Sequence, residues 1–99
     1  MALLIEYATL QGWRVTHFRP AWTSRGWRTP VHGDKGFPDI VCVRPPRIEF
    51  IECKTTSGRL SPEQTFWVKA LTGCEAKNPF VGVRVWTPEN WPTAQYVLR

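Results

Sequence analysis

The sequence predicts a small α/β domain with a mixed central β-sheet flanked by helices, in the order α-β-β-β-α-β-α. Two segments rich in apolar and β-branched residues flank Pro45-Pro46, a strong helix-start signal follows at Ser61, and another β-branched segment follows that helix. A length of 99 residues accommodates one domain and not two. We therefore expect a single domain with one core.

The first third of the chain is expected to hold a helix, a strand and a loop. Residues 2–12 place apolar side chains at rough helical spacing, and Gly12 ends that helix. Residues 13–22 are rich in β-branched and aromatic side chains, which favours a strand. Residues 23–36 have no period and several glycines and basic residues, which predicts a long, basic, mobile loop.

The rest of the chain has clearer signals. Residues 39–44 and 47–54 are expected to form two strands that are apolar on both faces, as in a sheet covered on both sides. Ser61 is a helix N-cap, with Pro62 at the first helical position and Gln64 placed to close a capping box. We expect Gly73 to end this helix, residues 80–86 to form a strand and residues 88–98 a short final helix.

The turn at Pro45-Pro46 fixes which residues of the two strands face each other. A symmetric turn pairs Arg44 with Arg47 and, counted back along both strands, Asp39 with Glu52. Side chains alternate along a strand, so Asp39, Glu52 and Lys54 are expected on one face. An asymmetric loop would shift this register.

Two carboxylates opposite each other on neighbouring strands, with Cβ atoms roughly 4.5–5.5 Å apart, repel unless a cation lies between them. Oxygen ligands of this kind suit Mg²⁺ or Mn²⁺. With Lys54 two residues beyond Glu52, the set fits metal-assisted phosphodiester hydrolysis. The alternative is a surface salt bridge between Glu52 and Lys54 or an arginine, because the Glu-x-Lys pattern is common in strands.

The charge balance favours an anionic partner, most commonly nucleic acid. Thirteen Lys and Arg against eight Asp and Glu give a formal net charge of +5. Basic residues concentrate in the first half of the chain, where we expect contacts with the DNA backbone, unless they form an ordinary solvated surface. They are Arg14, Arg19, Arg25, Arg28, Lys35, Arg44 and Arg47. Trp22 and Trp27 between them are candidates for base stacking or for a dimer contact.

Other classes of protein are disfavoured. No apolar run approaches the roughly 20 residues that span a bilayer, and the first residues make a poor signal peptide. The three widely spaced cysteines form no Cys-x-x-Cys pair, which argues for a reducing cytoplasm rather than for disulfides or structural zinc. Cys42 and Cys53 are expected to be buried apolar fillers, and Trp67 a core residue.

Three segments together resemble the VRR-NUC domain of the PD-(D/E)XK nuclease superfamily. They are Gly36-Phe37-Pro38-Asp39, Glu52-Cys53-Lys54, and the stretch from Gly58-Arg59-Leu60-Ser61 through Gln64 to Trp67. The resemblance covers about residues 2–87 and is closest to the compact stand-alone form of phages and bacteria. It implies a mixed sheet flanked by helices and a nuclease that depends on Mg²⁺ or Mn²⁺.

The resemblance also assigns roles to individual residues. Asp39 and Glu52 would bind the metal together with the backbone carbonyl of Cys53, and Lys54 would be the catalytic lysine. Gln64 would lie beside the site, although the residues alone allow it to be only a helix cap. Glu6 would complete the metal shell, although the residues alone allow it to lie on a solvated helix face.

The function expected from these observations is a structure-selective DNA endonuclease acting at Holliday or other branched junctions. Stand-alone family members resemble junction resolvases and are often homodimers, so we expect a homodimer in the cytoplasm of a bacterial cell or a phage-infected host. The alternatives are a nuclease of another specificity (nicking, flap or single-strand) and a non-catalytic DNA-binding module. The complete Asp, Glu-x-Lys set argues against the latter.

Overall fold

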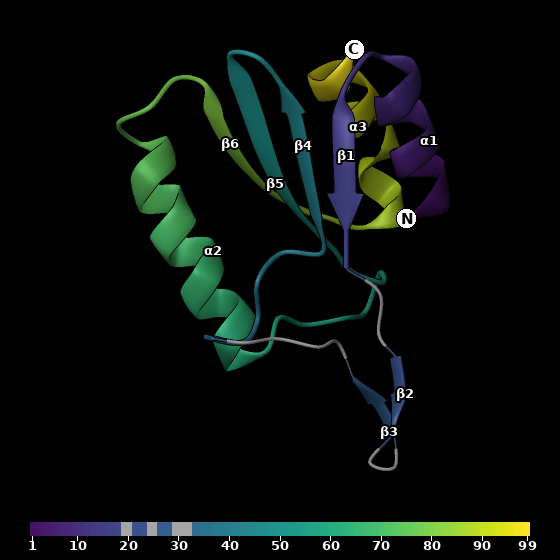
Figure 1. Cartoon of the computed structure of the whole chain (residues 1–99), viewed down its shortest axis with the longest axis vertical. Helices are drawn as coiled ribbons and strands as arrows, with labels where there is room; N and C mark the ends of the chain where they lie inside the picture. Colours follow the sequence, from purple (N-terminus) through teal and green to yellow (C-terminus); the bar gives the residue numbers. More distant parts are fainter. Residues whose placement is uncertain (19–20, 24–25, 29–32) are drawn as a thin grey trace.

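A four-stranded mixed sheet forms the centre of the computed structural model, which describes residues 1–18, 21–23, 26–28 and 33–99 (Figure 1). The strand order is β1-β4-β5-β6, formed by β1 (Arg14–His17), β4 (Ile40–Arg44), β5 (Arg47–Cys53) and β6 (Val81–Trp86). Strand β4 is antiparallel to both of its neighbours, β1 and β5, and β6 runs parallel to β5. The predicted α/β class with a mixed sheet is therefore confirmed.

Helices flank the sheet on both sides. Helix α1 (Ala2–Leu10) and helix α3 (Trp91–Leu98), which follows the 3₁₀ turn η1 (Pro88–Asn90), lie together on one side, and α2 (Pro62–Glu75) lies beside β6 (Figure 1). Ser61 begins α2 with the predicted capping box. Among the described residues, no helix combines the length and apolar character needed to cross a lipid bilayer.

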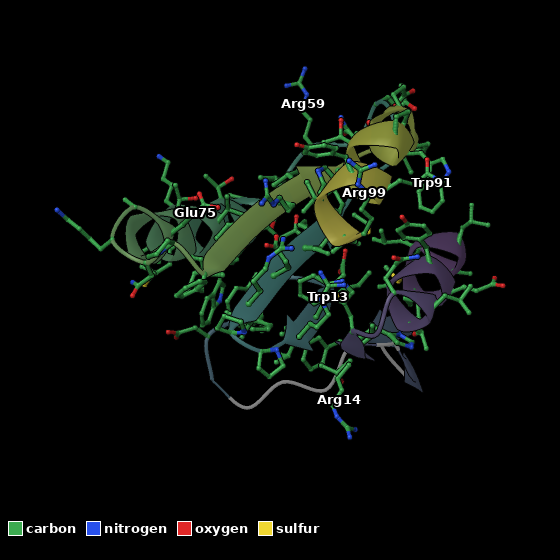
Figure 2. All side chains as sticks on the ribbon, turned by 90° about the horizontal axis from the view of Figure 1, so that it is seen from above. Trp13, Arg14, Arg59, Glu75, Trp91 and Arg99 are labelled. Atoms are coloured by element: carbon green, nitrogen blue, oxygen red, sulfur yellow. The ribbon has the colours of Figure 1, made fainter. Side chains whose placement is uncertain are left out.

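The apolar core lies between the sheet and helices α1 and α3. Trp13 is at its centre, where its indole Nε1 donates to the Leu98 carbonyl at 2.7 Å (Figure 2). Cys42 is fully buried here as a filler, and burial raises the pKa of its thiol to about 11. The buried apolar residues are Leu4, Ala8, Trp13, Ile40, Cys42, Ile51, Trp86, Ala94 and Leu98.

The structure corrects three predicted boundaries. The strand expected over residues 13–22 is shorter, and a two-stranded sheet of β2 (Ala21–Thr23) and β3 (Gly26–Arg28) occupies part of the expected loop. Strands of three residues are too short to show a period in the sequence. Helix α2 continues through Gly73 to Glu75, because Gly73 does not adopt the positive φ that ends a helix. The predicted mobility of residues 24–25 and 29–32 concerns residues outside the described part of the chain.

The predicted register of the central hairpin is confirmed. Arg44 pairs with Arg47 and Ile40 with Ile51, so the next position on each strand is Asp39 opposite Glu52. Side-chain alternation then separates the two faces of the sheet. Ile40, Cys42 and Ile51 face the core under α1 and α3, whereas Asp39 and Glu52 belong to the opposite face.

Candidate active site

Asp39 and Glu52 meet at the end of the sheet where β4 begins and β5 ends, near the first turn of α2 (Figure 1). The Asp39 carboxylate Oδ2 accepts a hydrogen bond from the backbone N–H of Cys53 at 3.0 Å. The Asp39 carbonyl accepts another from the Phe18 N–H at 3.1 Å, at the end of β1. Asp39 is thereby held from both neighbouring strands, beside the residue that follows Glu52.

Glu52 is a buried carboxyl group, with 2% of its surface exposed. Its Oε1 is buried, and no hydrogen-bond donor reaches it from the described residues. The pKa of Glu52 is raised to about 8, mainly by burial and also by the neighbouring Asp39, whereas the positive charge of Lys54 acts to lower it. The pair therefore resists carrying two negative charges unless a cation joins it.

Lys54 supplies one positive charge at this position. Its Nζ lies 4.0 Å from Glu52 Oε2, and its side chain is 19% exposed. The backbone N–H of Lys54 donates to the Trp86 carbonyl at 2.8 Å, which fixes its place at the end of β5. The alternative of a surface salt bridge does not describe this contact, because the Glu52 carboxylate is removed from solvent.

Gln64 connects helix α2 to the Asp39–Glu52 pair through a contact with Glu52. Its Oε1 accepts from the Ser61 N–H at 2.9 Å, and its own N–H donates to Ser61 Oγ at 3.1 Å, which completes the capping box. The amide Nε2 of the same side chain donates to Glu52 Oε2 at 3.4 Å. One conformation of Gln64 therefore makes both the capping contacts and the contact with Glu52, which the residues alone leave as alternatives.

The carboxylate oxygens of Asp39 and Glu52 are ligands of the type that a hard divalent cation prefers. The described residues contain no group of three or more acidic, histidine or cysteine side chains, but Mg²⁺ commonly binds through one or two carboxylates and retains several waters. The unpaired Oε1 of Glu52 offers a free ligand oxygen. The N–H and C=O of one residue in a strand face the same neighbour, so the Cys53 carbonyl is directed to the side on which Asp39 lies.

Glu6 does not join this group. Helix α1 buries Leu4 and Ala8 against the core face of the sheet, and Glu6 between them is exposed. Asp39 and Glu52 belong to the other face. The structure thus places Glu6 on the exposed side of α1 and does not bring it together with Asp39 and Glu52, so the metal role that the resemblance implies for it stays a prediction.

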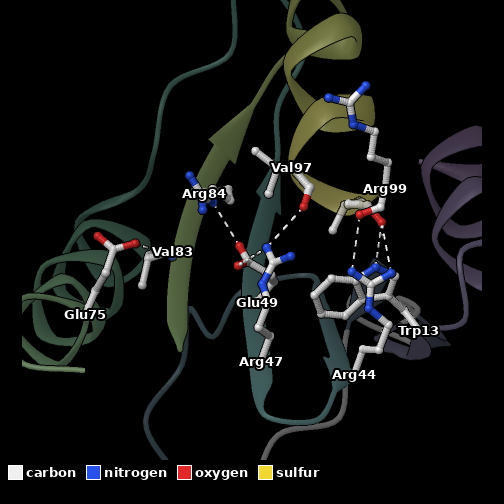
Figure 3. A network of polar contacts seen from close by, with 10 residues as sticks. Trp13, Arg44, Arg47, Glu49, Glu75, Val83, Arg84, Val97 and Arg99 are labelled. Atoms are coloured by element: carbon white, nitrogen blue, oxygen red, sulfur yellow. Dashed lines mark hydrogen bonds and ion pairs between the residues drawn. The ribbon is translucent and has the colours of Figure 1, made fainter. Parts of the chain in front are cut away.

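Two of the arginines expected to bind DNA lie in a polar network on the core face (Figure 3). Arg44 donates to the carbonyls of Gln11 at 2.8 Å and Arg99 at 3.2 Å, and its guanidinium lies 4.4 Å from the centre of the Trp13 ring. Arg47 donates to buried Glu49 at 3.2 Å, which Arg84 also contacts at 2.8 Å. These partners hold both guanidinium groups against the fold.

The other predicted DNA contacts are distributed differently. Arg14 is exposed and projects from the molecule (Figure 2), and Lys35 is exposed in the segment that leads to Asp39. Lys35 also lines an open pocket of about 570 Å³ together with Pro62, Glu63 and Phe66 of α2. Arg19, Arg25 and the side chains of Arg28, Trp22 and Trp27 lie outside what the structure describes.

Sequence reasoning did not select Arg59 as a DNA contact. This exposed arginine lies between Lys54 and Ser61, and it projects into solvent in Figure 2. Its place between the Glu-x-Lys strand and the capped helix is the signal that could have identified it. Arg59 lies in the second half of the chain, outside the segment in which the other basic residues are concentrated.

The comparison with protein families agrees with this geometry. The model of the VRR-NUC domain matches residues 15–85, a span that contains Asp39, Glu52, Cys53, Lys54 and Gln64. No curated protein matches the chain. Because the family match covers well over half of the 99 residues, the chain belongs to the VRR-NUC domain family and is a nuclease.

Proposed function

We propose that this nuclease is a Mg²⁺- or Mn²⁺-dependent DNA endonuclease that cuts Holliday or other branched junctions. The observation that carries the proposal is the buried Glu52 carboxyl group beside Asp39, with an oxygen that no donor reaches in the described residues. A buried carboxylate next to a second carboxylate is costly without a cation. The cost is understandable if the pair exists to bind one.

Each residue of the candidate site has a proposed role. Asp39, Glu52 and the backbone carbonyl of Cys53 would hold the ion, and Gln64 keeps the Glu52 carboxylate oriented through its hydrogen bond. When bound, a divalent ion polarises the scissile phosphate and lowers the pKa of a water. Lys54 places its ammonium group beside Glu52, where it can stabilise the negative charge that develops on the phosphate.

DNA backbone contacts are proposed for the exposed basic residues that adjoin the site. Lys35 precedes Asp39 by four residues, and Arg59 follows Lys54 in the next loop. Among the described residues, neither has a hydrogen-bond or ion-pair partner like those that hold Arg44 and Arg47. Arg14, Arg19, Arg25 and Arg28 remain proposed contacts on the strength of the charge pattern.

The proposed active form is a homodimer. A four-way junction has two-fold pseudosymmetry, and a C₂ dimer presents two active sites to two scissile bonds. Within the described residues, one chain, whose longest dimension is 40 Å, forms one such acidic pair. All three cysteines are free, which fits the proposed reducing cytoplasm.

A substrate panel tests the specificity. Four-way, flap, duplex and single-stranded DNA are incubated with the protein in Mg²⁺, in Mn²⁺ or in EDTA, and sedimentation at micromolar concentration gives the oligomeric state. The proposal predicts cleavage of four-way junctions by a dimer in either metal. Preferential cleavage of flaps or single strands, or a monomer, overturns the junction proposal, and binding without cleavage in every metal would make the chain a DNA-binding module.

A further inference from the structure

An aromatic cluster of four residues lies directly beside the candidate site. Phe37 is its centre and makes edge-to-face contacts with three other rings of the described residues, with ring centroids 5.7 Å from Phe18, 6.0 Å from Phe50 and 5.0 Å from Trp67. These rings come from the end of β1, from β5 and from α2. The cluster therefore joins the strands that carry the acidic residues to the helix that carries Gln64.

Each residue of the site is close in sequence to one member of this cluster. Phe37 precedes Asp39 by two residues, and Phe50 precedes Glu52 by two on the same face of β5. Trp67 follows Gln64 by three residues, so the two side chains lie on one side of α2. A change in the way that the rings pack would thus move the site residues relative to one another.

Trp67 has a polar contact that fixes it further. Its indole Nε1 donates to the Asp34 carbonyl at 3.3 Å, so the helix holds the segment leading to Asp39 by a ring contact and by a hydrogen bond. A residue needed only to fill space would not require this bond. The contact specifies both the distance and the orientation of α2 against that segment.

Gly36 permits the same close approach. Its φ is +94°, and a Cβ atom added there would lie 2.5 Å from the Glu63 carbonyl carbon and 2.7 Å from the Gln64 nitrogen. Any larger residue would force the first turn of α2 away from the segment before Asp39. The backbone that carries Gln64 is thus held against this segment by contacts on two sides, from Gly36 and from Trp67.

We infer that Trp67 is a positioning residue: together with Phe37 and Gly36 it sets the approach of α2 to the sheet, and so sets the Gln64–Glu52 hydrogen bond that orients the proposed metal ligand. This inference rests on the proposed function, because it assigns to the cluster a role in cation affinity. Partners that orient metal ligands typically change metal affinity by roughly 10- to 100-fold when they are removed.

The test compares Trp67→Leu with Trp91→Leu. Trp91 makes an edge-to-face contact with Tyr7 at 5.6 Å on the other side of the sheet, so the control removes an equivalent ring pair away from the site. The Mn²⁺-induced shift in melting temperature is measured without DNA, together with kcat, KM and the half-activating Mn²⁺ concentration. A milder variant, Trp67→Phe, which keeps an aromatic ring but loses the indole N–H, covers the case in which Trp67→Leu does not fold.

The inference predicts a half-activating Mn²⁺ concentration about tenfold higher in Trp67→Leu, a smaller Mn²⁺-induced shift and an unchanged KM for DNA. Trp91→Leu should lose melting temperature but keep the native response to Mn²⁺. If the native protein responds to Mn²⁺ and both variants respond equally, the inference is overturned and the proposed function stands. If the native protein shows no response, the proposed metal site fails, and the inference fails with it.

Discussion

The Asp39 carboxylate and the Cys53 backbone are joined by a hydrogen bond of 3.0 Å across the β4–β5 hairpin. This bond places Asp39 next to the peptide that follows Glu52, and it uses only one of the two Asp39 oxygens. The carboxyl group of Glu52 is buried in the same region with a free Oε1. The relationship brings two acidic residues that are thirteen positions apart into one compact group of carboxylate oxygens.

Replacement of Glu52 by Gln should separate activity from stability. Cleavage should fall by on the order of a hundredfold or more, because a ligand of the proposed ion is lost. The metal-free variant should melt at a higher temperature than the native protein near pH 8, because the neutral amide removes a buried like charge beside Asp39. Calorimetry and a cleavage assay on the same preparations test both. A variant that is fully active contradicts the assigned role of Glu52.

The stability of the metal-free protein should depend on pH through Glu52. Its pKa is raised from 4.5 to about 8 in the folded state, first by burial and then by Asp39. The folded state therefore holds the proton more tightly than the unfolded state does. The contribution is fully present below about pH 4.5 and is lost as the pH rises through 8.

The measurement is the difference in melting temperature between the native protein and Glu52→Gln from pH 4.5 to pH 8.5 in EDTA. The native protein should lose stability relative to the variant as the pH rises, and added Mg²⁺ should reverse the loss. Parallel curves for the two proteins would show that Glu52 does not titrate in this range.

A matched pair of glycine substitutions tests the network on the core face. A Cβ atom at Gly82 would collide with the carboxylate of Glu49, which is buried between Arg47 and Arg84. Gly82→Ala should lower the free energy of unfolding by roughly 1–3 kcal/mol. Gly73→Ala, in a helix and with no atom within 4 Å of the added Cβ, should raise it by about 0.5–1 kcal/mol. Urea denaturation gives both values, and equal effects would refute this packing.

The salt dependence of DNA binding tests the assignment of Arg59. The slope of log K against log salt should become about one unit less steep in Arg59→Ala, because each phosphate contact releases roughly 0.9 of a counterion. Lys77→Ala is the control, because this substitution also removes one positive charge, but near the other end of α2. Binding titrations without divalent metal, between about 50 and 200 mM salt, give the slopes of both variants. Equal slopes in the two variants contradict the contact.

The central hairpin was predictable because local rules determine it. The Pro45-Pro46 turn and the side-chain alternation of two short strands fix the register that brings Asp39 to Glu52. The capping box at Ser61 is equally local. These features need no knowledge of distant contacts, so the acidic pair and the start of α2 followed from the sequence.

Other features depend on distances that the sequence does not contain. A count of basic residues gives the sign of a surface but not the partners of each side chain, and Arg44 and Arg47 are occupied by backbone carbonyls and by Glu49. Glu6 lies on a helix whose packing direction is set by Leu4 and Ala8. The contact of Gln64 with Glu52 depends on the separation between α2 and β5, which the sequence does not contain and which the Phe37–Trp67 contact helps to hold.

Cleavage of a labelled four-way junction by native protein and by Asp39→Asn, at a temperature where both are folded, tests the central claim most directly. The account predicts cleavage by native protein in Mg²⁺, none in EDTA, and a loss of about a hundredfold or more in the variant, whose amide is a poorer ligand for a hard cation. Cleavage that persists in EDTA, or an Asp39→Asn variant as active as the native protein, would contradict it.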